Sequence, residues 1–114
     1  MTTSENLPYD IQERKVIAET SDLRVAEMIL APGQFIPWHR HSHVTDTFFC
    51  LEGDLQIEMP RVGNAIRLTV GDSFVVPTPR AHRVSNVGKG LCRFVIVQGV
   101  GAYDFVPLPE PPTS

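Results

Sequence analysis

Short β-forming stretches separated by turn residues recur along most of the chain, and this recurrence restricts the fold more than any other feature. In the stretch 55–59, for example, apolar and polar residues alternate, as expected for a strand with one buried face. No long window shows the 3.6-residue periodicity of an amphipathic helix. The pattern predicts one all-β domain whose strands fold into a barrel, and 114 residues suffice for one domain only.

Turn residues divide the chain into nine expected strands. Gly33, Gly53 and Gly71 are expected to supply positive φ angles at sharp corners between them. Prolines are concentrated in the segment 107–114, which is expected to be extended or disordered because proline lacks the amide that a strand ladder needs. The barrel domain is therefore predicted to span residues 1–106. The expected strands are 15–19, 23–30, 35–41, 46–52, 55–59, 65–70, 73–76, 82–84 and 91–98.

Three histidines and one aspartate lie where the strands should bring them together. His39 and His41 alternate along one expected strand, so both imidazoles should point to the same face. Asp46 begins the next strand, and His82 begins a later one. Converging imidazoles and a carboxylate are ligands for a divalent transition metal. The sequence predicts that these four residues form a metal site.

Two motifs that contain these residues resemble the paired signature of the cupin family. Residues 33–53 have the spacing of the first motif, G-x5-H-x-H-x(3,4)-E-x6-G, and residues 71–86 have that of the second, G-x5-P-x-G-x2-H-x3-N. Asp46 stands at the position of the usual glutamate, and Pro79 at that of the usual glycine. The resemblance implies a double-stranded β-helix, which is a small jelly-roll barrel.

Aspartate at position 46 leaves two arrangements open. Its side chain is one methylene shorter than glutamate, so Asp46 either binds the metal directly or holds a water or an imidazole N–H beside it. Because the backbone position suits glutamate in the family, Asp46→Glu is expected to bind metal at least as tightly. His43 continues the alternation of His39 and His41, and is either a further ligand or a solvated loop histidine.

The residues expected inside the barrel are mostly apolar. Phe35, Val84, Phe94 and Ile96 belong to this group. Arg80 precedes His82 in a loop and is either solvated or a contact for a carboxylate at the barrel mouth. The candidate substrate pocket consists of Phe48, Cys50, Arg80 and Gln98.

Trp38, Arg40 and Phe49 have the opposite parity to the ligands and are expected to face outward. Large apolar groups on the outside of a small barrel need cover. The N-terminal strands or a second subunit would supply this cover. Because single-domain cupins commonly pair face to face, the resemblance implies a two-fold homodimer, with an interface that includes Trp38 or Phe49.

The resemblance to cupins predicts the fold more strongly than it predicts any reaction that the protein catalyses. Neutral imidazoles and a carboxylate suit Fe, Mn, Ni, Co or Zn, one per chain. Cupins include dioxygenases, sugar isomerases, decarboxylases, lyases and binding proteins. The absence of a second acid, lysine or tyrosine at an expected inward position disfavours an epimerase with paired acid and base. The leading expectation is a dioxygenase-like enzyme acting on a small metal-chelating molecule. The alternatives are a metal-containing binding or sensing module, and a barrel that has lost its metal.

Charge and composition restrict the partners. The net charge is −3 and no basic patch occurs, which argues against nucleic acid and anionic membranes. No run of 18 apolar residues or signal pattern is present, so a cytoplasmic location is expected. Cys50 and Cys92 should then remain reduced thiols.

Overall fold

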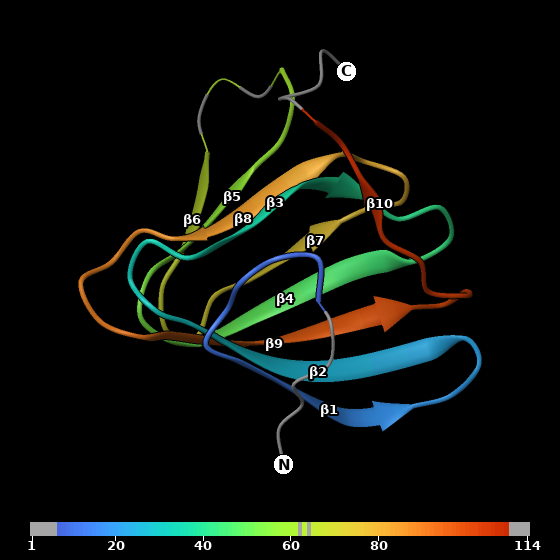
Figure 1. Ribbon diagram of the computed structural model, residues 1–114, viewed down its shortest axis with the longest axis horizontal. Coiled ribbons are helices and arrows are strands. Elements are labelled where there is room, and N and C mark those ends of the chain that lie inside the picture. Colours follow the sequence, from blue (N-terminus) through green and yellow to red (C-terminus); the bar gives the residue numbers. More distant parts are fainter. Residues whose placement is uncertain (1–6, 62, 64, 110–114) are drawn as a thin grey trace.

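The strands of the protein form two facing antiparallel sheets, seen in a computed structural model that describes residues 7–61, 63 and 65–109 (Figure 1). No α-helix occurs among these residues, so none there could cross a membrane as a long apolar helix. This architecture confirms the predicted all-β double-stranded β-helix.

The first sheet has the strand order β1-β2-β9-β4-β7. Alternate residues of its long strands are buried, as in β9, where Cys92, Phe94, Ile96 and Gln98 all face the interior. The period of two therefore assigns one face of this sheet to the core. Its strands are β1 (Glu13–Glu19), β2 (Leu23–Leu30), β4 (Thr45–Glu52), β7 (Ser73–Val76) and β9 (Cys92–Gly99).

The second sheet has the strand order β10-β3-β8-β5-β6 and closes the other side of the barrel (Figure 1). Apolar side chains of both sheets meet in one core that includes Leu30, Phe48, Leu55 and Phe94. The strands of the second sheet are β3 (Phe35–Arg40), β5 (Leu55–Glu58), β6 (Ile66–Leu68), β8 (His82–Asn86) and β10 (Val106–Pro107).

A β-bulge in β3 changes the direction of its first side chains. The β3–β8 register shifts between Ile36 and His39, and both of these residues are buried although three positions separate them. Phe35 is consequently 41% exposed, and the expectation that it faces the interior was wrong. Its ring lies under the guanidinium of Arg83, with Cζ 4.4 Å from the ring centroid.

The C-terminal segment forms a short edge strand that includes the first residue of the expected proline-rich tail, Pro107. Val106 pairs with Arg40 and Pro107 with His39 in an edge ladder, and Leu108 N donates to Trp38 O at 2.9 Å. Proline is tolerated in an edge strand because its missing amide can face away from the ladder. The expectation that no ladder forms in this segment was wrong at Pro107. Residues 110–114 of the expected tail lie outside the described residues.

Glycines with positive φ occupy the predicted corners. Gly33, Gly53 and Gly71 have φ values of 85°, 84° and 93°. At Gly53, a Cβ would lie 2.5 Å from Leu91 O, whereas nothing lies within 4 Å of the same position at Gly33. Gly53 is therefore required by both backbone angle and close packing, and Gly33 by the angle alone.

Candidate metal centre

The two sheets each contribute to one cluster of four buried side chains. His39 on β3 pairs with His82 on β8, and His41 follows directly after β3. Asp46 approaches from β4 in the facing sheet. One nitrogen or oxygen atom from each residue lies within 4.8 Å of the others. The structure therefore brings together all four residues that the sequence selected.

Backbone carbonyls fix the orientation of the three imidazoles. His39 Nδ1 donates to Pro37 O at 2.8 Å, His82 Nδ1 donates to Arg80 O at 2.9 Å, and His41 Nδ1 donates to Asp104 O. A carbonyl only accepts, so each Nδ1 carries the proton. Each Nε2 atom therefore directs its lone pair toward the centre of the cluster as a possible metal ligand, and this orientation is fixed before any metal binds.

Asp46 reaches the imidazoles despite its short side chain. Its Oδ2 lies 3.1 Å from His41 Nε2 and 2.9 Å from His82 Nε2. Gln98 Nε2 donates to the other oxygen, Oδ1, at 3.1 Å. Gln98 thus holds the carboxylate in place, which leaves Oδ2 directed at the centre of the cluster.

Burial and mutual contact shift the pKa values in this cluster. Burial, together with the neighbouring His82, lowers the pKa of His39 to about 3. Burial alone would raise the pKa of Asp46, but its close contacts with His41 and His82 hold this pKa well below its usual range. Burial alone would lower the pKa of His41, but its close contact with Asp46 outweighs this effect, so the pKa is raised. Near neutral pH the cluster contains a carboxylate and a neutral His39, as metal binding requires.

The donor set fits a divalent metal. His41 Nε2 is buried and has no hydrogen-bond partner among the described residues. With Nδ1 protonated, the lone pair of a neutral His41 faces the carboxylate of Asp46, an arrangement that needs a cation between them. Three neutral imidazoles and one carboxylate supply the ligand types of Zn, Fe, Mn, Ni or Co. The cluster is compatible with one such ion.

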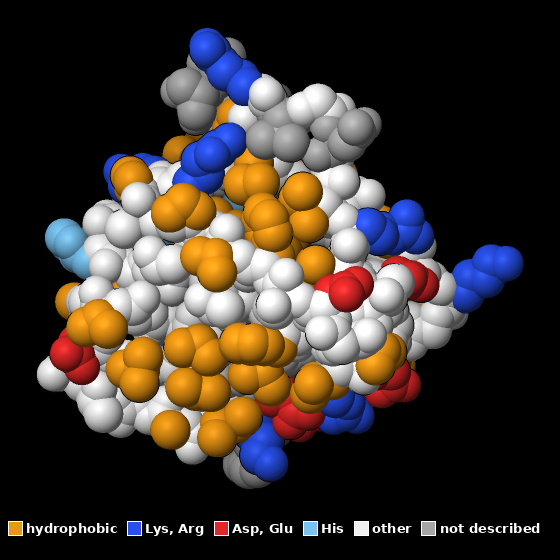
Figure 2. All heavy atoms as spheres, turned by 180° about the vertical axis from the view of Figure 1, so that it is seen from behind, with side chains coloured by type: hydrophobic (Ala, Val, Ile, Leu, Met, Phe, Trp, Pro, Cys, Tyr) orange, Lys and Arg blue, Asp and Glu red, His pale blue; other side chains and the backbone are white. Residues whose placement is uncertain are grey.

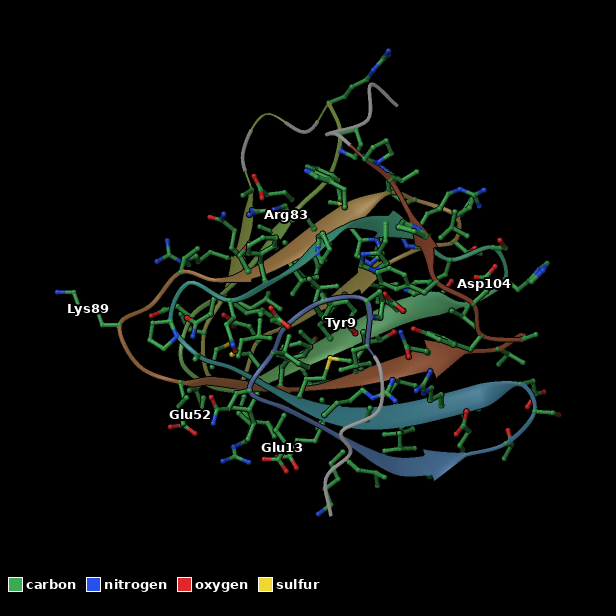
Figure 3. All side chains as sticks on the ribbon, viewed as in Figure 1. Tyr9, Glu13, Glu52, Arg83, Lys89 and Asp104 are labelled. Atoms are coloured by element: carbon green, nitrogen blue, oxygen red, sulfur yellow. The ribbon has the colours of Figure 1, made fainter. Side chains whose placement is uncertain are left out.

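Aromatic residues from outside the ligand strands cover the cluster. Phe105 stacks on His39 with ring centroids 4.5 Å apart, and Tyr103 lies 5.4 Å from His41. Tyr9 contacts Phe105 at 5.6 Å, and Figure 3 shows it in front of the opening between the sheets. The cavity that they close above the ligands has about 10 Å³ of free space, on the order of one water.

The predicted pocket residues separate into two groups. Phe48 and Gln98 line the small cavity beside His39 and Asp46. Cys50 does not line it and places its thiol 3.6 Å from Gly53 O. Arg80 is exposed, lies 3.5 Å from Pro60 O and lines a separate surface pocket. A substrate contact for Arg80 stays a prediction.

His43 is exposed and lies outside the cluster, in agreement with the solvated-loop alternative.

The covering residues and one carbonyl partner of the histidines were not predicted from the sequence. Tyr9, Tyr103 and Phe105 lie outside the motifs, in segments with no strand periodicity. Asp104 accepts from His41 through its backbone, and its side chain accepts from Ser42 N at 2.8 Å (Figure 3). The only available signal was the aromatic pair around Asp104, placed between the last long strand and the proline-rich segment.

A buried cluster of three histidines and one aspartate, held between two antiparallel sheets, defines a small β-barrel protein with a candidate metal site. The family model described as "Cupin domain" matches residues 26–98, more than half of the chain. The chain belongs to the cupin family.

Comparisons with curated proteins and solved structures agree with this family. Germin-like protein subfamily 2 member 2 of Arabidopsis thaliana is 30% identical over 73 residues, which are 61% of this chain and 33% of the relative. The chain thus spans about a third of the length of that relative. An uncharacterised conserved protein with a double-stranded β-helix domain from Klebsiella pneumoniae is 29% identical, with a TM-score of 0.75 and coverage of 85% and 84%.

Two further solved structures share the fold at lower identity. A structure of oxalate oxidase is 23% identical with a TM-score of 0.69, and covers 77% of this chain and 47% of its own. KdgF from Halomonas sp. is 23% identical with a TM-score of 0.68, and the coverage is 77% of both chains. At this identity the likeness concerns the fold alone.

Proposed function

We propose that His39, His41, Asp46 and His82 bind one divalent transition metal, and that the protein is an enzyme acting on a small molecule that coordinates this metal. The observation that carries the proposal is the preorganised cluster, in which every Nδ1 is bonded to a carbonyl and His41 Nε2 is buried without a hydrogen-bond partner in the described part of the chain. Burying polar ligand atoms in a fixed orientation costs folding free energy, and such groups are typical of functional sites.

Each residue of the site has a role that follows from its contacts. A metal bound there supplies Lewis acidity or, as Fe(II), a site for O₂. Gln98 orients Asp46, and Phe105 shields the ligands from water. Burial raises the pKa of Tyr9 to about 12 and raises that of Tyr103, so both hydroxyls stay protonated and available as hydrogen-bond donors near neutral pH.

Oxygen-dependent oxidation is the reaction class that we propose first. The cavity beside the ligands is lined mainly by apolar groups such as Met28 and Ile36. The sequence predicted no tyrosine there, which was wrong at Tyr9 and Tyr103, but the lining contains no lysine and no second acid among the described residues. This lining suits a compact, partly apolar substrate better than acid-base chemistry on a polyol. The fold shared with oxalate oxidase supports the choice at the level of the family only. Isomerisation, decarboxylation and elimination are the competing classes.

Metal content tests the ligand assignment. Purified protein should contain about one divalent transition metal per chain, measured by inductively coupled plasma mass spectrometry. His82→Ala should lose most of the metal. His43→Ala is the matched control, because His43 is exposed and lies outside the cluster, and it should keep the parental content. Equal metal in both variants would remove the basis of the assignment.

Oxygen uptake tests the reaction class. Protein loaded anaerobically with Fe(II) should consume O₂ on addition of a member of a panel of catechols, diketones and thiol acids. His82→Ala should not respond. Turnover of a sugar or a hydroxy acid without O₂ uptake would instead place the protein in one of the competing classes.

A metal-containing binding or sensing module is the second candidate, favoured by the small cavity. About 10 Å³ of free space admits a water but no organic substrate unless the aromatic cover moves. This candidate predicts saturable ligand binding by the metal-loaded protein without turnover of any panel compound.

We also propose a homodimer formed through the outer face of the first sheet. A mainly apolar row crosses that face in register, from Val75 through Thr47 and Val97 to Val25. Phe49 is 41% exposed, and Figure 2 shows apolar side chains gathered over the lower part of that view. Trp38 lies on β3 in the other sheet and is only half-buried, so Phe49 is the better interface residue. Light scattering should give twice the chain mass, and Phe49→Glu should give the monomer mass.

The cytoplasmic location expected from the sequence remains a proposal, supported by two buried free thiols, Cys50 and Cys92.

A further inference from the structure

A second cavity lies next to the candidate metal centre and contains a buried arginine. This outer cavity, of about 300 Å³, lies between the β1–β2 turn and the segment 101–103. Its lining includes Arg24, Gln98 and Tyr103, and the last two also line the small cavity above the metal ligands. Gln98 and Tyr103 therefore form the partition between the outer cavity and the metal centre. Its volume is at the lower end of the range for small-molecule sites.

Strand register places Arg24 in one polar row with the metal centre. Asp46 pairs with Gln98, Gln98 with Arg24, and Arg24 with Glu19 across β4, β9, β2 and β1. Arg24 has the inward parity of Ala26 and is 9% exposed. The row runs from the exposed Glu19 to a ligand of the candidate metal site.

Among the described residues, the guanidinium of Arg24 has its carboxylate neighbour, Glu19, only at 4.0 Å. Its Nε is buried without a hydrogen-bond partner in the described part of the chain. The Glu19 side chain is 53% exposed. The guanidinium carbon lies 4.3 Å over the Tyr103 ring, which holds the side chain but neutralises no charge. A buried cation is costly unless it is paired, and this one faces a cavity.

We propose that the outer cavity binds the carboxylate of a small organic acid at Arg24, and that the rest of the molecule reaches the metal between Gln98 and Tyr103 when the aromatic cover moves. The proposal rests on the proposed function and adds the substrate class. Guanidinium matches a carboxylate with two parallel N–H donors, which accounts for an arginine at this position. The apolar lining beyond the partition suits a short carbon chain.

Calorimetric titration with butyrate and with butyramide, its neutral analogue of the same shape, tests the proposal. The titrations use metal-free protein in chloride-free buffer at pH 7.5. Butyrate should bind saturably, and butyramide at least about tenfold more weakly, because loss of a charged partner costs on the order of 1.4 kcal/mol or more. Arg24→Gln should abolish the difference between the two probes. Arg67→Gln, which removes an exposed charge from β6, should leave butyrate binding unchanged.

Glu19→Gln provides an independent variant if Arg24→Gln does not fold. Glu19 is exposed and competes for the guanidinium, so its neutralisation should tighten butyrate binding several-fold. Equal affinity for butyrate and butyramide, or parental butyrate binding in folded Arg24→Gln, would overturn the proposal. No change in Glu19→Gln would also count against it.

The metal assignment is tested separately. His82→Ala should lose metal yet still bind butyrate, because Arg24 acts without the metal. If the metal assignment is wrong but Arg24 binds the carboxylate, butyrate binding will still be observed. If Arg24 does not bind the carboxylate but the metal assignment is right, the parent protein will still contain its metal.

Discussion

Lengthening Asp46 to glutamate tests how closely the site is built around the shorter side chain. Sequence reasoning expects Asp46→Glu to bind metal at least as tightly as the parent. The structure predicts the opposite, because Asp46 Oδ2 already lies 2.9–3.1 Å from two imidazole nitrogens. The added methylene must enter a cavity with about 10 Å³ of free space, which holds on the order of one water and is already bounded by Phe48 and Gln98. It would also displace Oδ1 from Gln98.

The expected magnitude follows from overpacking. An extra methylene in a closely packed interior costs about 1–3 kcal/mol, which for a domain of this size lowers the melting temperature by roughly 4–12 °C. Differential scanning calorimetry of metal-free protein measures the loss of stability, and titration with Zn²⁺ measures affinity. We expect a lower melting temperature and weaker Zn²⁺ binding. A parental melting temperature together with parental or tighter Zn²⁺ binding would refute the packing argument.

Asp46→Asn is the matched control. It keeps the volume and removes the charge, so it should weaken Zn²⁺ binding without an overpacking cost. If Asp46 only orients another ligand, the loss should be about 10-fold to 100-fold, and a direct ligand should lose more.

Three further predictions follow from the described contacts. Gly33→Ala should lower the unfolding free energy by about 1–2 kcal/mol because of the positive φ, and Gly53→Ala should lower it clearly more because its Cβ would also meet Leu91 O. Urea denaturation of both variants compares the two losses directly, and equal losses would contradict the packing argument. The pKa of His39 is lowered from 6.5 to about 3, so between these pH values the unfolded state of the metal-free protein binds one proton that the folded state does not, and the unfolding free energy should fall by up to about 1.4 kcal/mol per pH unit as the pH drops below 6.5. His39→Gln should reduce this slope, measured by urea titrations at pH 4.5–7. Phe105→Ala should destabilise the protein by less than the 3–5 kcal/mol typical of a fully buried phenylalanine, and should release bound Zn²⁺ to a chelator faster than the parent; an unchanged release rate would argue against its role as a cover.

The sequence predicted the barrel and the metal cluster because both depend on short-range regularities. Period-two alternation identified the long strands, and the motif spacing placed His39, His41 and His82 on one face. Alternation failed at Phe35, where a bulge inserts one residue and reverses parity. The local signal for this bulge was Pro37, which lies in the shifted stretch of β3, because a proline within a strand is confined to edges, strand starts and bulges. The size of the shift depends on the pairing with β8.

The aromatic cover could not be predicted, for a different reason. Tyr9 and Phe105 lie almost a hundred positions apart and meet only after the barrel has formed. Neither belongs to a periodic segment, so no pattern in the sequence assigns them to a face. The reach of Asp46 likewise depends on the distance between two sheets, which the tertiary fold alone determines.

The location of the cover in the chain has an evolutionary consequence. The four ligands lie within the family-matched segment 26–98, whereas Tyr9, Tyr103 and Phe105 lie before and after it. Substitutions in these flanking segments can alter what enters the site while the ligands and the main strand pairings stay under separate selection. A lineage with this arrangement can acquire a new substrate by changing two short pieces of chain. Members that agree closely across the barrel are then free to differ in what they bind.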